Sequence, residues 1–413
     1  MWLLACIANR ILVRRARWWL AVGLCLTAAG CADGPRGARA PSRAPYNVLL
    51  IVADDLSAAL GSYGDPHADT PELDRLARRG LRFERAYVQY PLCNPSRSSF
   101  LSGRRPATTR VFDGNTPPRH AIGDVEMLPE YFARNGYFTA RVGKVSHELF
   151  SGSVRWDVSE NAEPNPYFIP GDDSSAIRDN TWVIDGVADG LTGNEIVRRM
   201  GREGALPLVW RATGGSDAET PDGRTARRVI QILRERYGAA SDSTVAGTPP
   251  FFLAVGFHKP HQPWVAPKPY FDRHPFEAVT PPSAPADDRA DIPPSALTGY
   301  PDDAAHTGDQ VRQAIAAYHA TVSLMDAQVG LLLDALRELD LEDDTLVVLT
   351  SDHGFHLGEH GGLWRKHTLF EEATRVPLIV ALPGAPPRGA TSALVELVDL
   401  YPTLAELCGL TVP

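Results

Sequence analysis

The sequence predicts an α/β fold, in which a mainly parallel sheet is sandwiched between helices. Two observations support this prediction. Short apolar runs of strand length alternate along the chain with longer segments of helical periodicity. Several of the apolar runs end directly at acidic or histidine residues. Alternating strands and helices build parallel sheets with helices on both faces, and ligands collect at the carboxyl ends of the strands.

Six apolar runs have the length of buried strands. The first, Tyr46–Asp55, is continuously apolar until two acids close it, which indicates a strand buried on both faces. The run 345–350 is closed by Ser351, Asp352 and His353. All six expected strands are residues 46–55, 81–88, 137–142, 251–257, 345–350 and 377–381.

Five segments are expected to be helical. Residues 96–102 are delimited by Pro95, which suits a first helical turn, and by Gly103, which suits a C-terminal cap. Residues 71–79 and 128–135 each precede a strand. Residues 224–237 place Ala226, Val229, Ile230 and Leu233 on one face. Residues 310–339 repeat apolar side chains at helical spacing, at Val311, Ile315, Tyr318, Val322, Met325, Val329 and Leu333.

Two stretches interrupt this pattern. Residues 157–222 are polar and weakly periodic, and residues 262–309 are rich in Pro and Asp. Loops of this length in a compact domain are usually functional walls or lids. A disordered surface insertion is an equally open interpretation. The sequence shows no internal repeat.

The N-terminus has the pattern of an export signal. Arg14, Arg15 and Arg17 precede an apolar core, residues 18–29, that is too short to span a bilayer. Ala28-Ala-Gly-Cys31 resembles a bacterial lipoprotein cleavage box, with Cys31 as the lipidated residue. We therefore expect a signal peptide at 1–31, a flexible tether at 32–45 and one domain at 46–413. The expected location is the periplasm or the outer membrane, with membrane contact only through the lipid anchor; plain secretion is the alternative.

Charge and cysteine content restrict the possible partners. The formal net charge is −9, and since residues 1–31 carry four arginines and no acid, the remainder carries −13. An acidic body argues against nucleic acid as a partner, and an anionic ligand needs a local basic patch. Beyond residue 31 only Cys93 and Cys408 remain, so the chain does not depend on disulfides.

The segment around Cys93 carries the strongest chemical signal. It reads PLCNPSRSSFLSGRR over residues 91–105. Cys93 is expected at a helix N-terminus, where free N–H groups and the helix dipole favour an anion. Arg97, one turn later, can reach back with a planar fork of donors. The alternative is a structural cysteine, because cysteine is among the most buried residue types.

Two acidic pairs predict a metal site at the same sheet edge. Asp54-Asp55 and Asp352-His353 both close expected strands. Carboxylate oxygens suit calcium or magnesium. An isolated Asp-Asp pair is also common in turns and helix caps, so the prediction depends on the two pairs converging.

The chain resembles the type I sulfatases of the alkaline phosphatase superfamily, most closely the branch similar to iduronate-2-sulfatase. The matching motifs are NVLLIVADDL, CNPSRSSFLSGRRPATTRV, GYFTARVGKVSH, FFLAVGFHKPHQP, TSDHGFHLGEHG, RVPLIV and VELVDLYPTLAEL, within residues 46–413. The resemblance implies a sulfatase catalytic domain over 46–413 with the alkaline phosphatase-like fold. It also implies that the usual C-terminal subdomain is largely absent.

The resemblance further implies a cofactor and a ligand set. Cys93 would be oxidised to formylglycine by a formylglycine-generating enzyme or its equivalent. One calcium ion would be held by Asp54, Asp55, Asp352, His353 and the modified Cys93.

Catalytic roles are implied in the same way, for Cys93, Arg97, Lys144, His147, His258 and Lys366. The modified Cys93 would be the nucleophile and Arg97 would orient its hydrate. The other four residues would contact sulfate or the leaving oxygen. His261, His356 and His360 are assigned only to the substrate pocket. His319 and His367 are left as structural or surface residues, and no motif supports His120.

The implied activity is removal of sulfate from a sulfated sugar of a glycosaminoglycan or another polysaccharide. One hydroxyl of the hydrated aldehyde attacks sulfur, a His or Lys protonates the leaving alcohol, and the second hydroxyl expels sulfate. Basic residues in the motifs would attract the anion, namely Lys144, His258, Lys259, His261, Arg365 and Lys366. The alternatives are a phosphonate or phosphodiester hydrolase of the same fold, and a catalytically silent lipoprotein that binds sulfated glycans.

Overall fold

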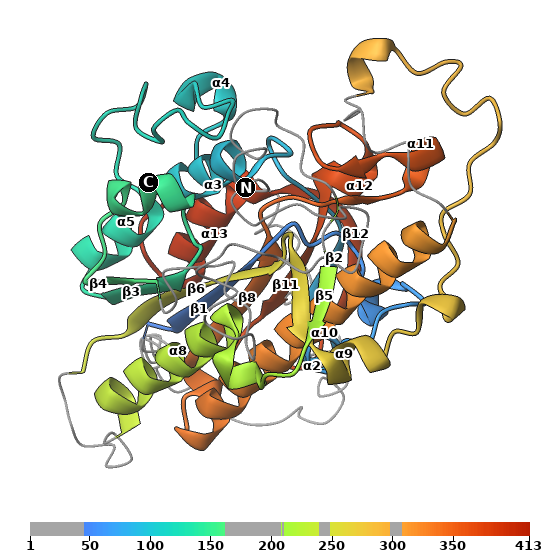
Figure 1. Cartoon of the computed structure of the whole chain (residues 1–413). Helices are drawn as coiled ribbons and strands as arrows, with labels where there is room; N and C mark the ends of the chain where they lie inside the picture. Colours follow the sequence, from blue (N-terminus) through green and yellow to red (C-terminus); the bar gives the residue numbers. More distant parts are fainter. Residues whose placement is uncertain (1–44, 162–207, 209, 239–247, 298–307) are drawn as a thin grey trace, which may run out of the picture.

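The computed structural model describes residues 45–161, 208, 210–238, 248–297 and 308–413 (Figure 1). The expected signal peptide and almost all of the tether lie outside these residues, as does most of the polar stretch 157–222. Among the described residues, no helix is long and apolar enough to cross a membrane.

An eight-stranded sheet forms the centre of the described part of the chain. From one edge to the other its strands are β12 (Gly389–Glu396), β2 (Leu81–Tyr87), β11 (Arg375–Ala381), β8 (Thr345–Ser351), β1 (Asn47–Asp54), β6 (Phe251–Pro260), β3 (Phe138–Gly143) and β4 (Val158–Glu160). The most apolar strands, β1, β6 and β8, lie side by side in the middle, where both faces are covered.

The sheet is parallel except for one strand. β1 pairs in parallel with β6 and β8, β3 with β6 and β4, and β12 with β2. β11 is antiparallel to both of its neighbours, β2 and β8. The predicted fold class, α/β with a mainly parallel sheet between helices, is confirmed.

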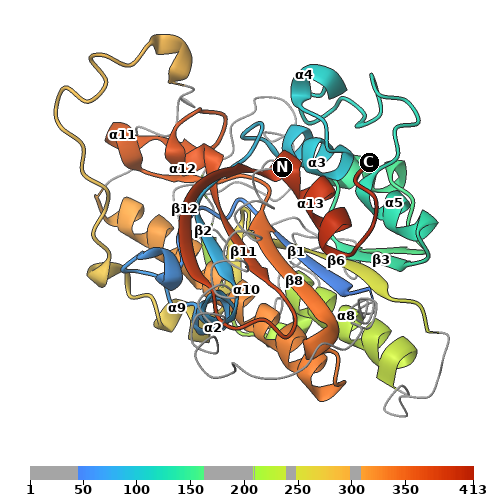
Figure 2. The same cartoon turned by 180° about the vertical axis from the view of Figure 1, so that it is seen from behind.

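Helices cover both faces of the sheet (Figures 1 and 2). On one face α2 (Pro71–Arg79), α8 (Pro221–Tyr237) and α10 (Gly308–Glu338) pack their apolar residues into one hydrophobic cluster. On the other face α3 (Cys93–Ser102), α5 (Leu128–Arg134) and α13 (Leu400–Leu407) form a second cluster. The shorter helices are α4 (Pro106–Thr109), α9 (Lys268–Asp272), α11 (Glu359–Gly362) and α12 (Glu371–Thr374). Side chains on β1 alternate between the two clusters, which is why its sequence is continuously apolar.

The predicted helix around Pro95 exists and begins earlier than expected. α3 starts at Cys93 itself, and Gly103 ends it in the left-handed region with φ 65°. Glycine adopts this conformation without strain. Cys93 therefore lies at the first position of a ten-residue helix.

Several elements were not predicted. β12 forms one edge of the sheet, and the motif VELVDLYPTLAEL is divided among the end of β12, a 3-10 turn and α13. Four more short strands pair outside the main sheet, β5 (Trp210–Thr213) with β7 (Trp264–Pro267) and β9 (His356–Leu357) with β10 (Trp364–Arg365).

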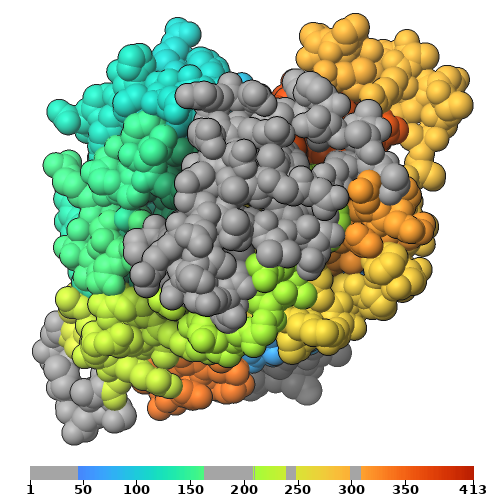
Figure 3. Space-filling view, viewed as in Figure 1, coloured from blue at the N-terminus to red at the C-terminus, as the bar shows by residue number. Residues whose placement is uncertain are grey.

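The described part of the Pro- and Asp-rich stretch 262–309 contains regular structure. It contains β7 and α9, and its following segment, residues 281–297, protrudes from the body of the molecule in yellow-orange in Figure 3. This segment is attached to α11, because Arg289 donates to the carbonyls of His360 and Gly361, at 2.6 and 3.2 Å. Residues 298–307 lie outside the described part.

Candidate active site

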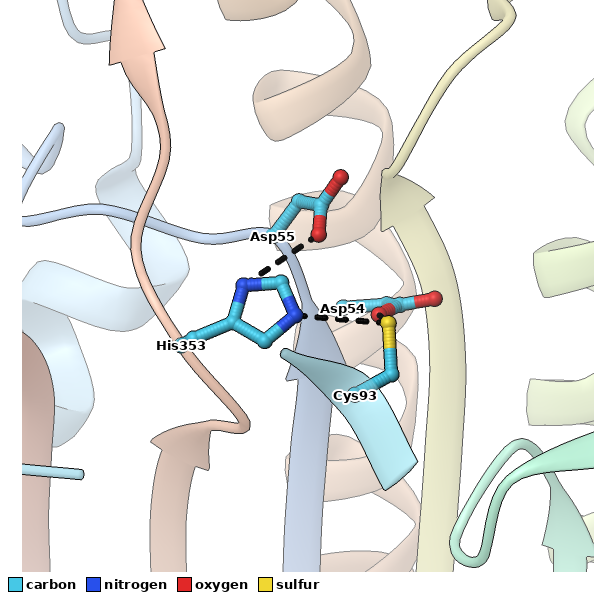
Figure 4. A group of neighbouring side chains, drawn as sticks. All are labelled: Asp54, Asp55, Cys93 and His353. Atoms are coloured by element: carbon cyan, nitrogen blue, oxygen red, sulfur yellow. Dashed lines mark hydrogen bonds and ion pairs between the residues drawn. The ribbon is translucent and has the colours of Figure 1, made fainter. Parts of the chain in front are cut away.

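Four predicted ligands meet at the carboxyl edge of the central strands (Figure 4). Asp54 is the last residue of β1, Asp55 follows it, His353 lies just beyond β8, and Cys93 begins α3. One ligand atom from each of these four lies within 4.8 Å of the others, and all four residues are buried. Neighbouring parallel strands that end together explain why residues nearly 300 positions apart come into contact.

Asp55 has an unusual backbone. Its φ of 67° lies in the left-handed region, which costs a non-glycine residue about 1–3 kcal/mol. Tyr318 of α10 holds this turn, since its hydroxyl donates to the Asp55 carbonyl at 2.8 Å and accepts the Ser57 N–H at 2.9 Å. Burial raises the pKa of the Asp55 carboxyl, although Lys366 and His353 oppose that shift.

Asp352 lies directly beside the group of four, in a different environment. Its Oδ1 accepts the backbone N–H groups of Asp55 at 3.2 Å and His353 at 2.9 Å. Its Oδ2 accepts Arg97 Nε at 2.8 Å. The structure thus brings Asp352 to the predicted site, but its carboxylate also orients the backbone of two other predicted ligands.

The side chain of Arg97, a residue of α3, contacts one carboxylate of each acidic pair. Besides Asp352, it approaches Asp54, with 3.4 Å between Nη2 and Oδ1, and it donates to the carbonyls of Lys144 and Val145. Its side chain is 1% exposed. Burial lowers its pKa, yet the two carboxylates more than offset this, so the guanidinium remains charged.

Two lysines complete the positive environment. Lys366 Nζ lies 2.6 Å from Asp55 Oδ1 and 3.3 Å from Cys93 Sγ. Lys144 Nζ pairs with Asp54 Oδ2. Burial lowers the pKa of both lysines, but the paired carboxylates hold each pKa above its usual range. Both lysines therefore carry a positive charge beside Cys93.

Cys93 is the convergence point of the site. Its Sγ lies 3.4 Å from Asp54 Oδ1 and 3.3 Å from both His353 Nε2 and Lys366 Nζ. Burial, together with the charge of Asp54, raises the pKa of this thiol, so an unmodified Cys93 is protonated at neutral pH. A protonated thiol is a poor nucleophile, because the reactive form is the thiolate.

The predicted catalytic histidines lie on the next strand ends. His258, near the end of β6, lines a cavity of about 280 Å³ together with Arg141, Lys144, Ser146, Glu148 and Asp222. His147 is half-buried and is not among the residues that line this cavity; burial and the charge of Lys144 lower its pKa to about 4. His147 is therefore neutral near pH 7.

The histidines assigned to the substrate pocket are placed differently from one another. His261 Nε2 lies 4.0 Å from Asp55 Oδ2, next to the site. His356 is fully buried and bonded to Thr368 Oγ1 at 2.7 Å, and His360 Nδ1 lies 3.1 Å from Asp288 Oδ2. None of the three lines the cavity beside His258.

Lys259, one of the basic residues expected to attract the anion, instead binds backbone carbonyls of the turn after β6. Lys259 donates its ammonium to the carbonyls of Pro263 at 2.6 Å and His261 at 3.2 Å. Burial lowers its pKa to about 8. Lys259 therefore stabilises the turn after β6.

Two residues that the sequence analysis missed also belong to this region. Asp222, at the start of α8, accepts the backbone N–H groups of His258 at 2.8 Å and Lys259 at 2.9 Å. Glu148 directly follows His147, and its carboxylate approaches both His258 and Lys144. The position of Glu148 next to the GKVSH motif was the available sequence signal for it.

The fold and these charged groups define a hydrolase of the alkaline phosphatase superfamily with a site for an anionic ester. Residues 46–410 match the family model described as Sulfatase, so the chain belongs to the sulfatase family and is a sulfuric ester hydrolase.

Curated relatives agree with this family. The chain is 36% identical to iduronate 2-sulfatase of Homo sapiens, over 97% of this chain and 76% of that protein. It is 33% identical to a sulfatase of Formosa agariphila, over 96% of this chain and 75% of that protein.

Among solved structures, the phosphonate monoester hydrolase of Agrobacterium radiobacter matches with a TM-score of 0.66 and 22% identity. The match covers 89% of this chain and 74% of that one. This likeness supports the fold.

Proposed function

We propose that this enzyme removes sulfate from a sulfated sugar, with Cys93 in its formylglycine form as the nucleophile and one calcium ion in the site. The observation that most directly supports this proposal is the position of Cys93 Sγ, which lies within 3.4 Å of Asp54, His353 and Lys366. The sulfur marks where the oxygens of the modified residue would lie.

The residues present fit a hard cation. Three carboxylates converge on one edge of the sheet, and such oxygen ligands are those that calcium prefers. Asp54, Asp55, Asp352, His353 and the modified Cys93 would hold the ion. When bound, the ion supplies positive charge to the oxygens of the transferring sulfuryl group.

The modified residue would supply two oxygens on one carbon, so the same group can first accept sulfate and then release it. Lys366 contacts Cys93 and Lys144 pairs with Asp54, and these two charged lysines would neutralise the sulfate oxygens. Arg97 fixes both acidic pairs and so maintains the geometry. His258 lines the same cavity as Lys144, and we assign protonation of the leaving oxygen to His258.

The proposed substrate class is a sulfated glycosaminoglycan or another sulfated polysaccharide. The similarity to iduronate 2-sulfatases supports it. Charge supports it as well, since Lys144 and Lys366 lie at the site in a body of net charge −13. Such a local patch attracts an anion, and this attraction weakens as salt is added.

Export as a lipoprotein, anchored at Cys31 after the signal peptide is cleaved directly before that residue, belongs to the same proposal. So does maturation by a formylglycine-generating enzyme or its equivalent. Both rest on the sequence patterns around Cys31 and Cys93.

Mass spectrometry and a substrate panel test the proposal. The peptide containing Cys93 should carry an aldehyde in protein from a host able to make formylglycine, and Cys93→Ala should abolish turnover without unfolding the chain. A panel of sulfated sugars, choline sulfate, an aryl sulfate and a phosphonate monoester then tests substrate class. Turnover of the phosphonate alone would favour the phosphonate hydrolase alternative, and binding of sulfated glycans without turnover would favour the silent lipoprotein.

A further inference from the structure

Glu148 occupies a position between two groups of the proposed active site. Its Oε1 lies 3.5 Å from His258 Nδ1 and 3.8 Å from Lys144 Nζ. Its side chain is 39% exposed and lines the cavity of about 280 Å³ that also contacts both of these residues. The carboxylate thus faces an imidazole on one side and an ammonium on the other.

The backbone brings these groups together from different elements. Glu148 begins the 3-10 helix η2 (Glu148–Ser153), and Ser151 Oγ donates to its carbonyl at 2.6 Å. Lys144, just after β3, donates its N–H to Gly256 of β6 at 2.9 Å. A Cβ on Gly256 would lie 2.1 Å from the Lys144 carbonyl carbon, so glycine is required for this approach. The close pairing of β3 and β6 therefore aligns Glu148 with His258.

The electrostatics favour an ionised Glu148. Burial raises its pKa, but Lys144 and the hydrogen bond with His258 outweigh burial and lower the pKa to about 2. Glu148 therefore carries a full negative charge at any pH at which the enzyme would be assayed.

The other charged groups around His258 act on different parts of it. Asp222 on α8 accepts its backbone N–H, and so fixes the main chain. The ring of His261 lies 5.0 Å away, centroid to centroid. Lys144, from the end of β3, faces the same cavity. Glu148 supplies a carboxylate to the ring itself, at Nδ1.

We propose that Glu148 is a positioning residue that holds the His258 ring with Nδ1–H toward its carboxylate and so directs Nε2 to the leaving oxygen of the substrate. The inference rests on the proposed function, in which His258 protonates that oxygen. A carboxylate bonded to one ring nitrogen fixes the tautomer and orientation of the other, as in His-carboxylate pairs generally. The 3.5 Å between Glu148 Oε1 and His258 Nδ1 fits a catalytic contact that shortens when substrate binds.

A comparison of two substrates with different leaving groups tests this role of Glu148. A sugar alcohol is a poor leaving group and needs a proton, whereas 4-nitrophenolate leaves readily without one. Glu148→Gln should lower kcat for a sulfated monosaccharide by about 10- to 100-fold, because general acid catalysis contributes about 10²–10⁴-fold and part of it survives. With 4-nitrophenyl sulfate kcat should change by less than about 3-fold, and inhibition by inorganic sulfate should be unchanged.

Matched variants separate positioning from structure. Glu148→Asp keeps the charge and should recover part of the lost kcat. In a His258→Gln background, Glu148→Gln should cause no further loss, since the group that it positions is gone. Glu338→Gln, an exposed acid paired with Arg234 at 3.2 Å, should match the wild type on both esters.

The other results distinguish failure of the proposed function from failure of the role of Glu148. If the wild type cleaves neither ester, the proposed function fails. If the wild type cleaves both and Glu148→Gln loses equal activity on both, or loses further activity in the His258→Gln background, the function stands and the role of Glu148 is refuted. Should Glu148→Gln fail to fold, the same comparison of two esters is made with Glu148→Asp, where an equal loss on both esters again refutes the role.

Discussion

Removing a single hydroxyl from α10 should weaken the proposed metal site without touching any ligand. Tyr318 is fully buried, and its hydroxyl bonds both the Asp55 carbonyl and the Ser57 N–H. Tyr318→Phe leaves both backbone groups without this partner. An unsatisfied buried polar group costs about 1–3 kcal/mol, and half-buried Ser57 can recover some of its loss from water. We expect the free energy of unfolding to fall by about 2–3 kcal/mol.

The same change should reduce calcium affinity. Asp55 is held at φ 67°, a conformation that it would leave if its restraint were removed. If restoring that turn upon binding costs about 1.4 kcal/mol, the affinity falls about tenfold. Urea denaturation of metal-free protein measures the first effect, and isothermal titration with calcium measures the second.

Tyr237→Phe is the matched control. Its hydroxyl donates one bond, to the Pro249 carbonyl at 3.1 Å, on the far end of α8. We expect a loss of about 1 kcal/mol in stability and no change in calcium affinity. An unchanged calcium affinity in Tyr318→Phe, despite the expected loss of stability, would refute the view that this hydroxyl supports the metal site.

Three further predictions concern stability and turnover. Asp326→Ala should lower the free energy of unfolding, measured by urea denaturation, by about 2 kcal/mol. The reason is that the Asp326 carboxylate accepts two N–H groups at the start of α2, including that of Leu73 at 2.7 Å. An unchanged free energy of unfolding would contradict this. Burial lowers the pKa of His319 to about 3, whereas an unfolded histidine has a pKa of about 6.5. Below pH 6.5 the unfolded chain therefore binds a proton that the native chain does not bind. The free energy of unfolding should fall by about 2 kcal/mol between pH 7 and pH 5 for this reason. His319→Gln should lack that part of the acid sensitivity, and parallel pH profiles of the two proteins would show the reasoning to be wrong. Lys366→Ala should lower kcat/KM on the sulfated substrate by about two orders of magnitude, as expected for one lost charged contact in the transition state, while a loss below about fivefold would exclude the assigned role.

Much of the fold could be predicted because burial leaves a direct trace in the sequence. The continuous apolar run of β1 and the Pro-to-Gly limits of α3 each follow from one local rule, and both were confirmed. β11 shows the limit of such rules. Its apolar run has the same pattern in either direction, and its antiparallel pairing depends on which neighbours it meets. The edge strand β12 is half-exposed and lacks a continuous apolar run.

The candidate site was predictable where motifs carry it, and less so elsewhere. Asp54, Asp55, Cys93 and His353 converge as expected, while their role as ligands stays a prediction. Glu148 adjoins the GKVSH motif, but that position alone does not reveal its role, since its partner His258 is 110 positions away. Its importance appears only when the ends of β3 and β6 are placed side by side.

The pairing of β1 with β8 has a consequence for how this protein reaches its active form. Asp54 and His353 lie 299 positions apart in the sequence, yet their strands are neighbours in the middle of the sheet. Contacts between such distant segments form late, because closing a long loop is slow. The site therefore requires the pairing of β1 with β8, and partly folded chains without that pairing lack it. Calcium uptake would then report completed folding, and a calcium-binding assay would count native molecules more directly than a measure of helix content.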